Sequence, residues 1–382
     1  MNWLKGQAKG PKKLWFQDEN EPPRFVDVER INSALSEDVD VTQAKKLHVC
    51  SRPEFCAQGQ THGHKGFLIN RDEALRLLRQ HPEYRDVLVP FLIGDDMIGR
   101  RDRRPSRYAI DFAPRTIFDS ERFADLFKRV KDGVLEKREA AAKKEEKANK
   151  DALKKNPNAR VNWHHKQFLE HWWWFSYPRE ALVQLLGGLD RYIACVRVTK
   201  RPIFEFVSSK IHPNDALQVF PFEDDYSFGI LQSGLHWKWF TARCSTLKAD
   251  PRYTSNTVFD TFPWPQQPTQ NDVKKVAKAA VALRKLRTKL MAENGLTLRE
   301  LYRSAEQPGT NPLKDAQEAL DEVVADAYGM KARDRHNPLV YFLRLNAEVS
   351  ELESKKIKVL GPGLPPVAKG REAFVTDDCI EP

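Results

Sequence analysis

The tetrapeptide Phe-Pro-Trp-Pro at residues 262–265 constrains the fold most, because the sequence changes character there. Pro263 and Pro265 exclude a helix interior or a central strand, since proline lacks a backbone N–H and fixes φ. Short alternating apolar segments, typical of strands, precede it. After it, residues 273–290 repeat apolar side chains at helical spacing, and Gly295 ends that helix. We therefore predict an α+β protein, a mixed domain followed by a small all-α helical domain.

The 382 residues allow two or three domains, and composition divides them into four segments. Residues 1–57 are polar and interrupted by proline, which indicates a connector with one short helix at Val26–Leu35. The mixed domain occupies residues 58–265 and the helical domain residues 270–355. A Pro/Gly-rich tail, 356–382, is expected to be flexible. Residues 120–155 are rich in Ala, Lys and Glu, so a solvated helix is predicted there.

Charge and cysteine content indicate which partners and which cellular compartment to expect. The formal net charge is +10, which favours a polyanionic partner only as a bias in encounter. Five cysteines, an odd number, fit a reducing compartment and hence a cytoplasmic location. The sequence shows neither a signal peptide nor an apolar run of membrane-spanning length, so no membrane partner is expected.

A zinc site is the first chemical hypothesis to test, because Cys50 and Cys56 lie near His62 and His64. The gap between the cysteines is wider than the usual two to four residues of a zinc motif. The neighbouring carboxylates Asp95 and Asp96 are better explained by a Gly-Asp turn. We therefore predict no metal site.

Catalytic motifs of nucleic-acid enzymes are not recognisable. A methyltransferase that modifies an exocyclic amine needs a glycine-rich cofactor loop and an Asn/Asp/Ser-Pro-Pro-aromatic motif. The Pro-Pro pairs within Glu21–Arg24 and Leu364–Val367 lack the required neighbours. No Walker-type phosphate loop is present, and the Glu-Ser-Lys at 353–355 is a pattern that occurs by chance. No catalytic residue and no cofactor-binding residue are therefore assigned.

Several ordered motifs nevertheless resemble one family. They are SFGILQSGLHWKWF at 227–240, RYTSNTVFDTFPWP at 252–265, QGQTHGHKGFLINRDEA at 58–74 and the helical stretch 301–329. Together these motifs are similar to MmeI-like (type IIL) adenine-specific DNA methyltransferases, and the resemblance extends from Ile31 to Glu353. In that family the N-terminal half carries the methyltransferase domain, often preceded by a nuclease, and the C-terminal half recognises the DNA sequence.

The resemblance implies that residues 1–57 trail an absent methyltransferase domain and that 58–265 form a target-recognition domain. It implies double-stranded DNA and a methyltransferase catalytic domain or subunit as partners, with S-adenosylmethionine bound in the missing catalytic half. The chain would then be the specificity half of an adenine-N6 methyltransferase of restriction-modification or phage-defence type, and would not methylate DNA alone. Two alternatives stay open: an autonomous DNA- or RNA-binding protein, and a complete enzyme with an unrecognised active site.

Base readout is predicted for Lys248 and Asp250. They are separated by one residue, so their side chains project the same way from an extended loop. Lysine can donate to O6 and N7 of guanine and aspartate can accept from N4 of cytosine, so the pair could read one G·C pair. The resemblance supports this, because the family reads a base pair with this loop. The alternative is an ion pair in a solvent-facing turn.

Phosphate contacts set the register of a protein on DNA, and basic side chains make most of them. We expect fewer than half of the candidates to touch DNA, and the Lys-Arg-Pro turn at 200–202 is the preferred phosphate clamp. The tryptophans at 172–174, 237 and 239 are expected mostly in the core or at domain interfaces. The phosphate candidates are Arg100, Arg101, Arg103, Arg104, Arg107, Arg179, Arg197, Lys200, Arg201 and Arg252.

Overall fold

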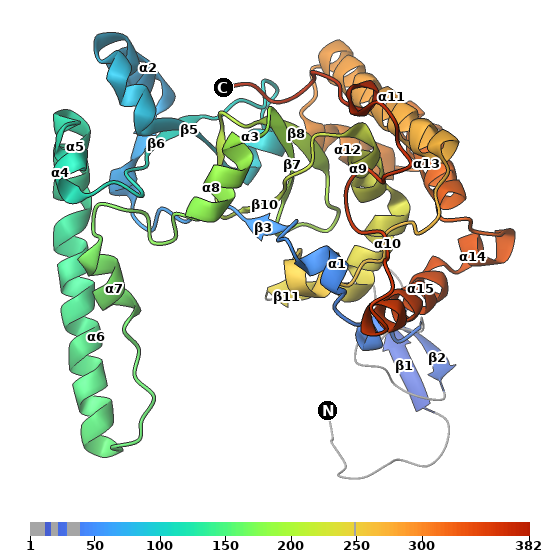
Figure 1. Ribbon diagram of the computed structural model, residues 1–382, viewed down its shortest axis with the longest axis horizontal. Helices are drawn as coiled ribbons and strands as arrows, with labels where there is room; N and C mark the ends of the chain where they lie inside the picture. The colour runs from blue at the N-terminus through green and yellow to red at the C-terminus, as the bar shows by residue number, and fades with distance from the viewer. Residues whose placement is uncertain (1–11, 17–21, 29–38, 248–249) are drawn as a thin grey trace.

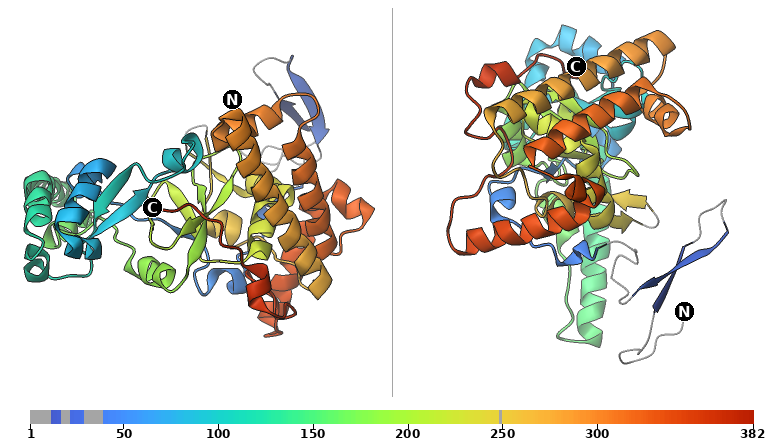
Figure 2. Two further views of the ribbon diagram at one scale, coloured as in Figure 1. Left: turned by 90° about the horizontal axis from the view of Figure 1, so that it is seen from above. Right: turned by 90° about the vertical axis from the view of Figure 1, so that its right-hand side faces the viewer.

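The structure, a computed structural model, describes residues 12–16, 22–28, 39–247 and 250–382. The predicted α+β class is confirmed. Two lobes lie at opposite ends of an elongated molecule, with a central sheet between them (Figures 1 and 2). None of the described helices is both long and apolar enough to cross a bilayer.

The first lobe is built on a small sheet with strand order β4-β6-β5-β9, in which only the β5·β9 pair is parallel. Its own hydrophobic core includes Phe67, Phe91, Phe112 and Trp172. The elements of this lobe are β4 (Leu68–Asn70), α2 (Arg71–Gln80), β5 (Leu88–Leu92), β6 (Arg107–Ile110), α4 (Ile117–Glu121), α5 (Ala124–Val130), α6 (Glu136–Lys155), α7 (His164–Glu170) and β9 (His212–Pro213). The helix α3 (Gly94–Gly99) follows β5 but buries Met97 and Ile98 in the other hydrophobic core.

The central sheet is antiparallel, with strand order β3-β10-β7-β8. Its apolar residues and those of the C-terminal helices form one continuous core, in which Phe262 and Trp264 are almost fully buried. The elements around this core are α1 (His48–Ser51), β3 (Ala57–Gln58), α8 (Glu180–Gly187), β7 (Arg191–Val196), β8 (Phe204–Ser208), β10 (Leu217–Phe220), α9 (Asp225–Gln232), α10 (Gly234–Arg243), α11 (Gln270–Asn294), α12 (Leu298–Glu306), α13 (Pro312–Ala327), α14 (Ala332–His336) and α15 (Pro338–Ser354).

The Phe-Pro-Trp-Pro segment therefore marks a change of element type within one core. Its two aromatic rings fasten the chain where it passes from the sheet to the helices, and α11 packs against α9 as well as α13. The second boundary in the structure, between the two hydrophobic cores, falls inside the predicted 58–265 domain.

Local capping signals predicted several helices correctly. The Asn70 side chain accepts a hydrogen bond from the backbone N–H of Glu73 and so caps α2. Gly295 ends α11 with φ of +61°, in the left-handed region where a residue without Cβ is favoured.

Three predicted elements differ in the structure. Residues Val26–Val28 of the predicted helix belong to strand β2 (Arg24–Val28), which pairs with β1 (Lys12–Phe16); residues 29–35 lie outside the described residues. The rings of Trp15 and Phe25 face each other across this pair, 5.1 Å apart, and such aromatic cross-strand contacts favour a strand. The predicted Gly-Asp turn is the short helix α3, and the predicted solvated helix is divided into α4, α5 and α6.

The helix α6 is also solvated on one side only. Glu145 is buried and accepts hydrogen bonds from the backbone N–H groups of His165 and Lys166 at the start of α7. Asn149, likewise buried, exchanges hydrogen bonds with the backbone of Asn162. Polar contacts thus hold α7 and the preceding loop against a helix whose sequence suggested full exposure.

The C-terminal segment, expected to be a flexible tail, packs against the central sheet. Phe374 and Ile380 are buried, and Ile380 hydrogen-bonds with the backbone of β8 on both its N–H and its carbonyl. The Asp378 carboxylate pairs with Arg284 at 2.7 Å. The Pro/Gly-rich composition suggested a mobile tail. It could not show that the edge strand β8 and the buried Arg284 are partners of this segment.

Candidate nucleic-acid interface

Two of the ten predicted phosphate contacts are arginines that already have carboxylate partners. Arg103 pairs with Glu205 at 2.8 Å, and Glu205 is a buried residue that also pairs with Arg287 at 3.1 Å. Arg100 donates to both oxygens of Asp102 at 3.0 Å, and this pairing raises the pKa of Arg100. Each of these guanidinium groups already has a carboxylate beside it, more buried at Arg103 than at Arg100, and phosphate contact by either arginine stays a prediction.

Three further candidates lie on or beside the same loop, between α3 and β6. Arg101 is exposed, and its guanidinium lies beside Gly295 at the turn between α11 and α12. Arg104 is also exposed. Arg107, the first residue of β6, donates to the Ser106 hydroxyl at 3.2 Å. Arg101 thus lies near the helical segment, whereas Arg107 and Asp215 both act on the pKa of His62.

Backbone pairing brings Arg197 and Arg252 together. Arg197 follows β7, donates its N–H to Ala216 and accepts from the N–H of Tyr253 at 2.7 Å. The short hairpin of β11 (Ser245–Leu247) and β12 (Asp250–Arg252) therefore lies alongside the end of β7, and Arg252 bridges to Val198. These few hydrogen bonds bring together two arginines that are 55 residues apart in the sequence.

The environment of Arg197 is unusual for a surface arginine. Its guanidinium is partly buried, and its Nε is fully buried without a hydrogen-bond partner among the described residues. Burial lowers the pKa of Arg197, and the nearby cations Arg252 and Arg179 lower it further, whereas Asp215 opposes the shift. The exposed part of this guanidinium has two cations nearby and no ion-pair partner among the described residues, so it is suited to an anion or acceptor supplied from outside.

Asp215 is a residue of this surface that the sequence reasoning missed. Its carboxylate accepts a hydrogen bond from the Thr61 hydroxyl at 3.0 Å. Asp215 lies in the turn before β10, and its charge opposes the lowering of the Arg197 pKa, so the two side chains lie close together. Alternation around each strand was visible in the sequence, but the pairing of β7 with β10 was not.

Arg179 completes this face, which we call the Arg197 surface: Arg179, Arg197, Asp215 and Arg252. Arg179 is exposed and lies 5.5 Å above the ring of Tyr177, which is itself 42% exposed. Tyr177 exchanges two backbone hydrogen bonds of 3.1 Å with Thr61, next to Asp215. Among the described residues, none of the three arginines takes part in an ion pair.

The nearby histidines do not add charge at neutral pH. Burial, together with Arg138 and Lys137, lowers the pKa of His64 to about 4. Burial also lowers the pKa of His62. The positive potential of the Arg197 surface therefore comes from its arginines, which stay protonated at all physiological pH values.

Of the predicted base-reading pair, Lys248 lies outside the described residues. Asp250 is exposed at the start of β12, opposite Leu247 in the strand register. Asp250 and Arg252 are two residues apart on one strand, so both project from the same side of the hairpin. Base readout by Lys248 and Asp250 stays a prediction, now beside the Arg197 surface.

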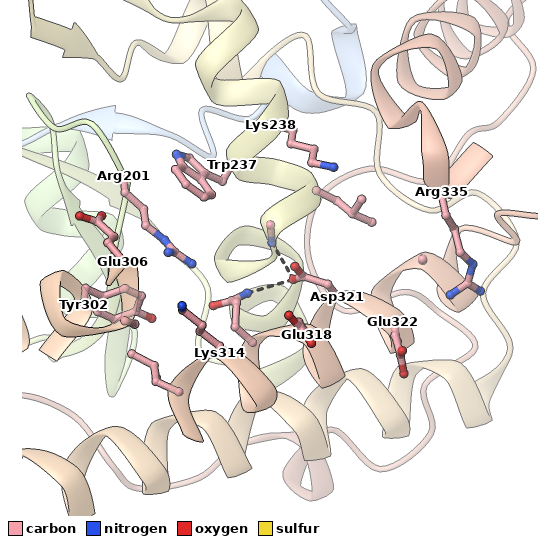
Figure 3. Close-up of a pocket in the computed structure, with 16 residues that line it drawn as sticks. Arg201, Trp237, Lys238, Tyr302, Glu306, Lys314, Glu318, Asp321, Glu322 and Arg335 are labelled. Atoms are coloured by element: carbon pink, nitrogen blue, oxygen red, sulfur yellow. Dashed lines mark hydrogen bonds between the residues drawn. The ribbon is translucent and has the colours of Figure 1, made fainter. Parts of the chain in front are cut away.

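The preferred phosphate clamp has a more specific structure than expected. Lys200 is exposed, and its carbonyl accepts a hydrogen bond from the Trp237 indole at 3.1 Å. Arg201 lies between two aromatic rings, 4.4 Å from Trp237 and 4.9 Å from Tyr302 (Figure 3). Such stacking fixes the guanidinium without neutralising it.

Two of the five tryptophans expected mostly in the core or at interfaces, Trp172 and Trp239, are buried, and the other three are partly buried against the two cores. Trp172 lies in the core of the first lobe and Trp239 in the main core, while the indoles of Trp173 and Trp174 both donate to the carbonyl of Arg115. Stacking of these rings on DNA therefore has no support in the structure.

The cysteines and histidines considered for zinc are separated by their structural roles. The Cys50 thiol donates to the carbonyl of Phe262, and the Cys56 sulfur accepts from the Gln218 amide. Burial raises the pKa of both thiols well above the ordinary value, which disfavours the thiolates that zinc requires. Within the described ranges, no three His, Cys, Asp or Glu side chains are grouped as a metal site.

Comparison with known proteins adds to this geometry. Residues 201–266 match the family described as MmeI, target recognition domain. The predicted resemblance to the MmeI family is confirmed. The matched MmeI segment contains Arg201, Asp215, Asp250 and Arg252, so it includes half of the Arg197 surface.

Two proteins show how far the MmeI likeness extends. DNA methyltransferase A of Bacillus subtilis (strain 168) is 36% identical over 131 residues, which cover 33% of this chain and 14% of that protein. The type IIL restriction-modification enzyme MmeI, solved in complex with DNA, superposes with a TM-score of 0.68 at 21% identity. That superposition covers 91% of this chain and 42% of MmeI, so this chain shares the fold of less than half of the enzyme.

Proposed function

We propose that this chain recognises a short sequence in double-stranded DNA, as the specificity half of an adenine-N6 DNA methyltransferase. The observation that carries the proposal is the Arg197 surface, where a partly buried, unpaired arginine adjoins a carboxylate at the segment that matches the MmeI target recognition domain. A polyanion with hydrogen-bonding edges is the ligand that such a surface fits.

Within the surface we assign two kinds of contact. Arg179, which is exposed, and Arg252, which is partly buried, have no ion-pair partner among the described residues and are suited to phosphates that set the register. Arg197 and Asp215 lie close together and offer a donor and an acceptor, which suits the edge of a base pair in the major groove. A well-placed contact of this kind contributes roughly 1–3 kcal/mol of discrimination against the wrong base.

Methyl transfer is assigned to a catalytic domain or subunit that works with this chain. S-adenosylmethionine would bind there and supply the methyl group, whereas the residues of this chain would select the DNA sequence. A restriction-modification or phage-defence system is the biological setting proposed for such a pair.

Selection of bound duplexes from a randomised DNA pool, at near-physiological salt, tests the proposal. We expect the purified chain to enrich one short motif. Binding that depends on salt but enriches no motif would leave only a non-specific phosphate-binding surface, and would contradict sequence recognition.

The same selection tests the predicted base-reading pair. The double change Lys248→Glu with Asp250→Arg reverses the positions of donor and acceptor, so one G·C position of the motif should change its preference. The unchanged protein in the same pool is the control. An identical motif from both proteins would remove Lys248 and Asp250 from the readout.

A further inference from the structure

A second basic surface lies on the other face of the central sheet. Its groove, of about 550 Å³, is lined by α3, by the turn between β7 and β8, and by α12. Val196 and Val198 line it, so alternation along this extended segment points the intervening Arg197 away from it. The groove is therefore distinct from the Arg197 surface, although the turn at 198–201 borders both.

The groove carries an excess of positive charge. Four of its lining residues are cations, Lys200, Arg201, Arg299 and Arg303, and two are carboxylates, Asp95 and Glu306. Arg299 and Arg303 are one helical turn apart on α12, so both side chains project from the same face of that helix. The ligand that this charge distribution favours is an anion.

Within the described part of the chain, one of the four cations takes part in an ion pair. Arg299 pairs with Asp95 at 2.6 Å, but the Asp95 side chain is 78% exposed, so solvent weakens that interaction. Arg303 is exposed and has no ion-pair partner among the described residues, and Arg201 is held by aromatic rings alone. The cations of this groove thus remain available to an external anion.

The neighbouring pocket, which shares Arg201 and Tyr302, provides a contrast. It lies between α10, α12 and α13 and also has four cations, but carboxylates of Glu306, Glu318, Asp321 and Glu322 balance them (Figure 3). A polyanion would meet repulsion along α13 there. The excess charge of the α12 groove therefore does not extend into this neighbouring pocket.

We propose that the α12 groove binds the phosphodiester backbone of the DNA that flanks the recognised sequence. This inference rests on the proposed function, because a duplex on the Arg197 surface must extend past the turn at 198–201 to reach the groove. The helical segment after Phe-Pro-Trp-Pro would then contribute affinity through phosphates, without reading any base.

The test compares two duplexes that contain the selected motif. One ends at the motif, and the other extends by about 10 base pairs, one helical turn, on each side. We expect the unchanged protein to bind the longer duplex more tightly. The double variant Arg299→Gln with Arg303→Gln should lose that gain, lower the salt slope on the longer duplex by about 1.8, and bind the short duplex normally.

The matched control is Lys274→Gln with Lys278→Gln, two exposed cations one turn apart on α11. It should behave as the unchanged protein on both duplexes. Equal binding of both duplexes by the unchanged protein, or equal losses on both by the α12 variant, would overturn the proposal. A scrambled short duplex separates the two ideas: if it binds as well as the motif, sequence recognition itself has failed.

Discussion

The buried arginines and those of the Arg197 surface differ in what surrounds them. Arg191 and Arg284 share the buried carboxylate of Asp225, at 3.2 and 2.6 Å, and both also contact Asp378. Arg197 has no carboxylate within ion-pair distance among the described residues, although it too is partly buried. One residue type therefore supports the fold in one region and remains available to a ligand in the other.

The electrostatic consequence of this difference is visible at Asp378. Burial alone would raise the pKa of its carboxyl, but hydrogen bonds and charge from Arg284, Thr376 and Arg191 lower it to about 2. In contrast, Arg197 is surrounded mainly by other cations. The net charge of +10 counts paired and unpaired side chains alike, so it does not show which arginines are available to a ligand.

Loss of the shared carboxylate should have the largest effect. Asp225→Ala leaves two buried guanidinium groups short of a partner, so we expect unfolding free energy to fall by roughly 3–5 kcal/mol. Urea unfolding followed by tryptophan fluorescence measures it. Asp151→Ala, at an exposed position on α6, should cost less than about 0.5 kcal/mol. Equal costs for the two changes would show that the buried cluster does not support the fold.

A buried histidine should make stability depend on pH, whereas the exposed arginines should not. His236 is fully buried, its Nδ1–H donates to the Leu231 carbonyl, and burial lowers its pKa to about 4. The unfolded chain binds this proton near pH 6.5, so the contribution is complete above that pH and is lost as pH falls towards 4.

Relative to His236→Gln, the unchanged protein should therefore lose on the order of 3 kcal/mol between pH 6.5 and 4. Burial raises the pKa of the Asp224 carboxyl to about 6, so its contribution to stability increases as pH falls, opposite to that of His236. Because both proteins keep Asp224, their difference reports His236 alone. Parallel pH profiles of unfolding midpoint for the two proteins would contradict the assignment.

The smallest expected effects concern phosphate contacts. Arg179→Ala and Arg252→Ala should each weaken binding about equally for all sequences and reduce the salt slope of DNA affinity by about 0.9. Arg100→Ala removes an arginine that already pairs with Asp102, so it should change the slope less than either of the other two variants. Fluorescence anisotropy titrations over a range of salt concentrations measure all three. A salt slope that changes only in Arg100→Ala would show that the paired arginine, and not Arg179 or Arg252, contacts phosphates.

The sequence predicted what local chemistry determines. The capping asparagine of α2, the glycine that ends α11 and the family resemblance were all readable from neighbouring residues. It could not predict which arginines are paired, because Arg103 and its partner Glu205 are 102 residues apart. Nor could it find Asp215, whose place beside Arg197 depends on the pairing of β7 with β10.

The most direct test of the account compares Arg197→Ala with Arg103→Ala on a duplex containing the selected motif. Both arginines were candidates by sequence, but only Arg103 has a carboxylate partner. Once both variants are shown to fold, Arg197→Ala should lose roughly 1–3 kcal/mol of binding and its preference at one base pair, while Arg103→Ala binds as before. Loss of affinity in Arg103→Ala with normal binding by Arg197→Ala would contradict the account.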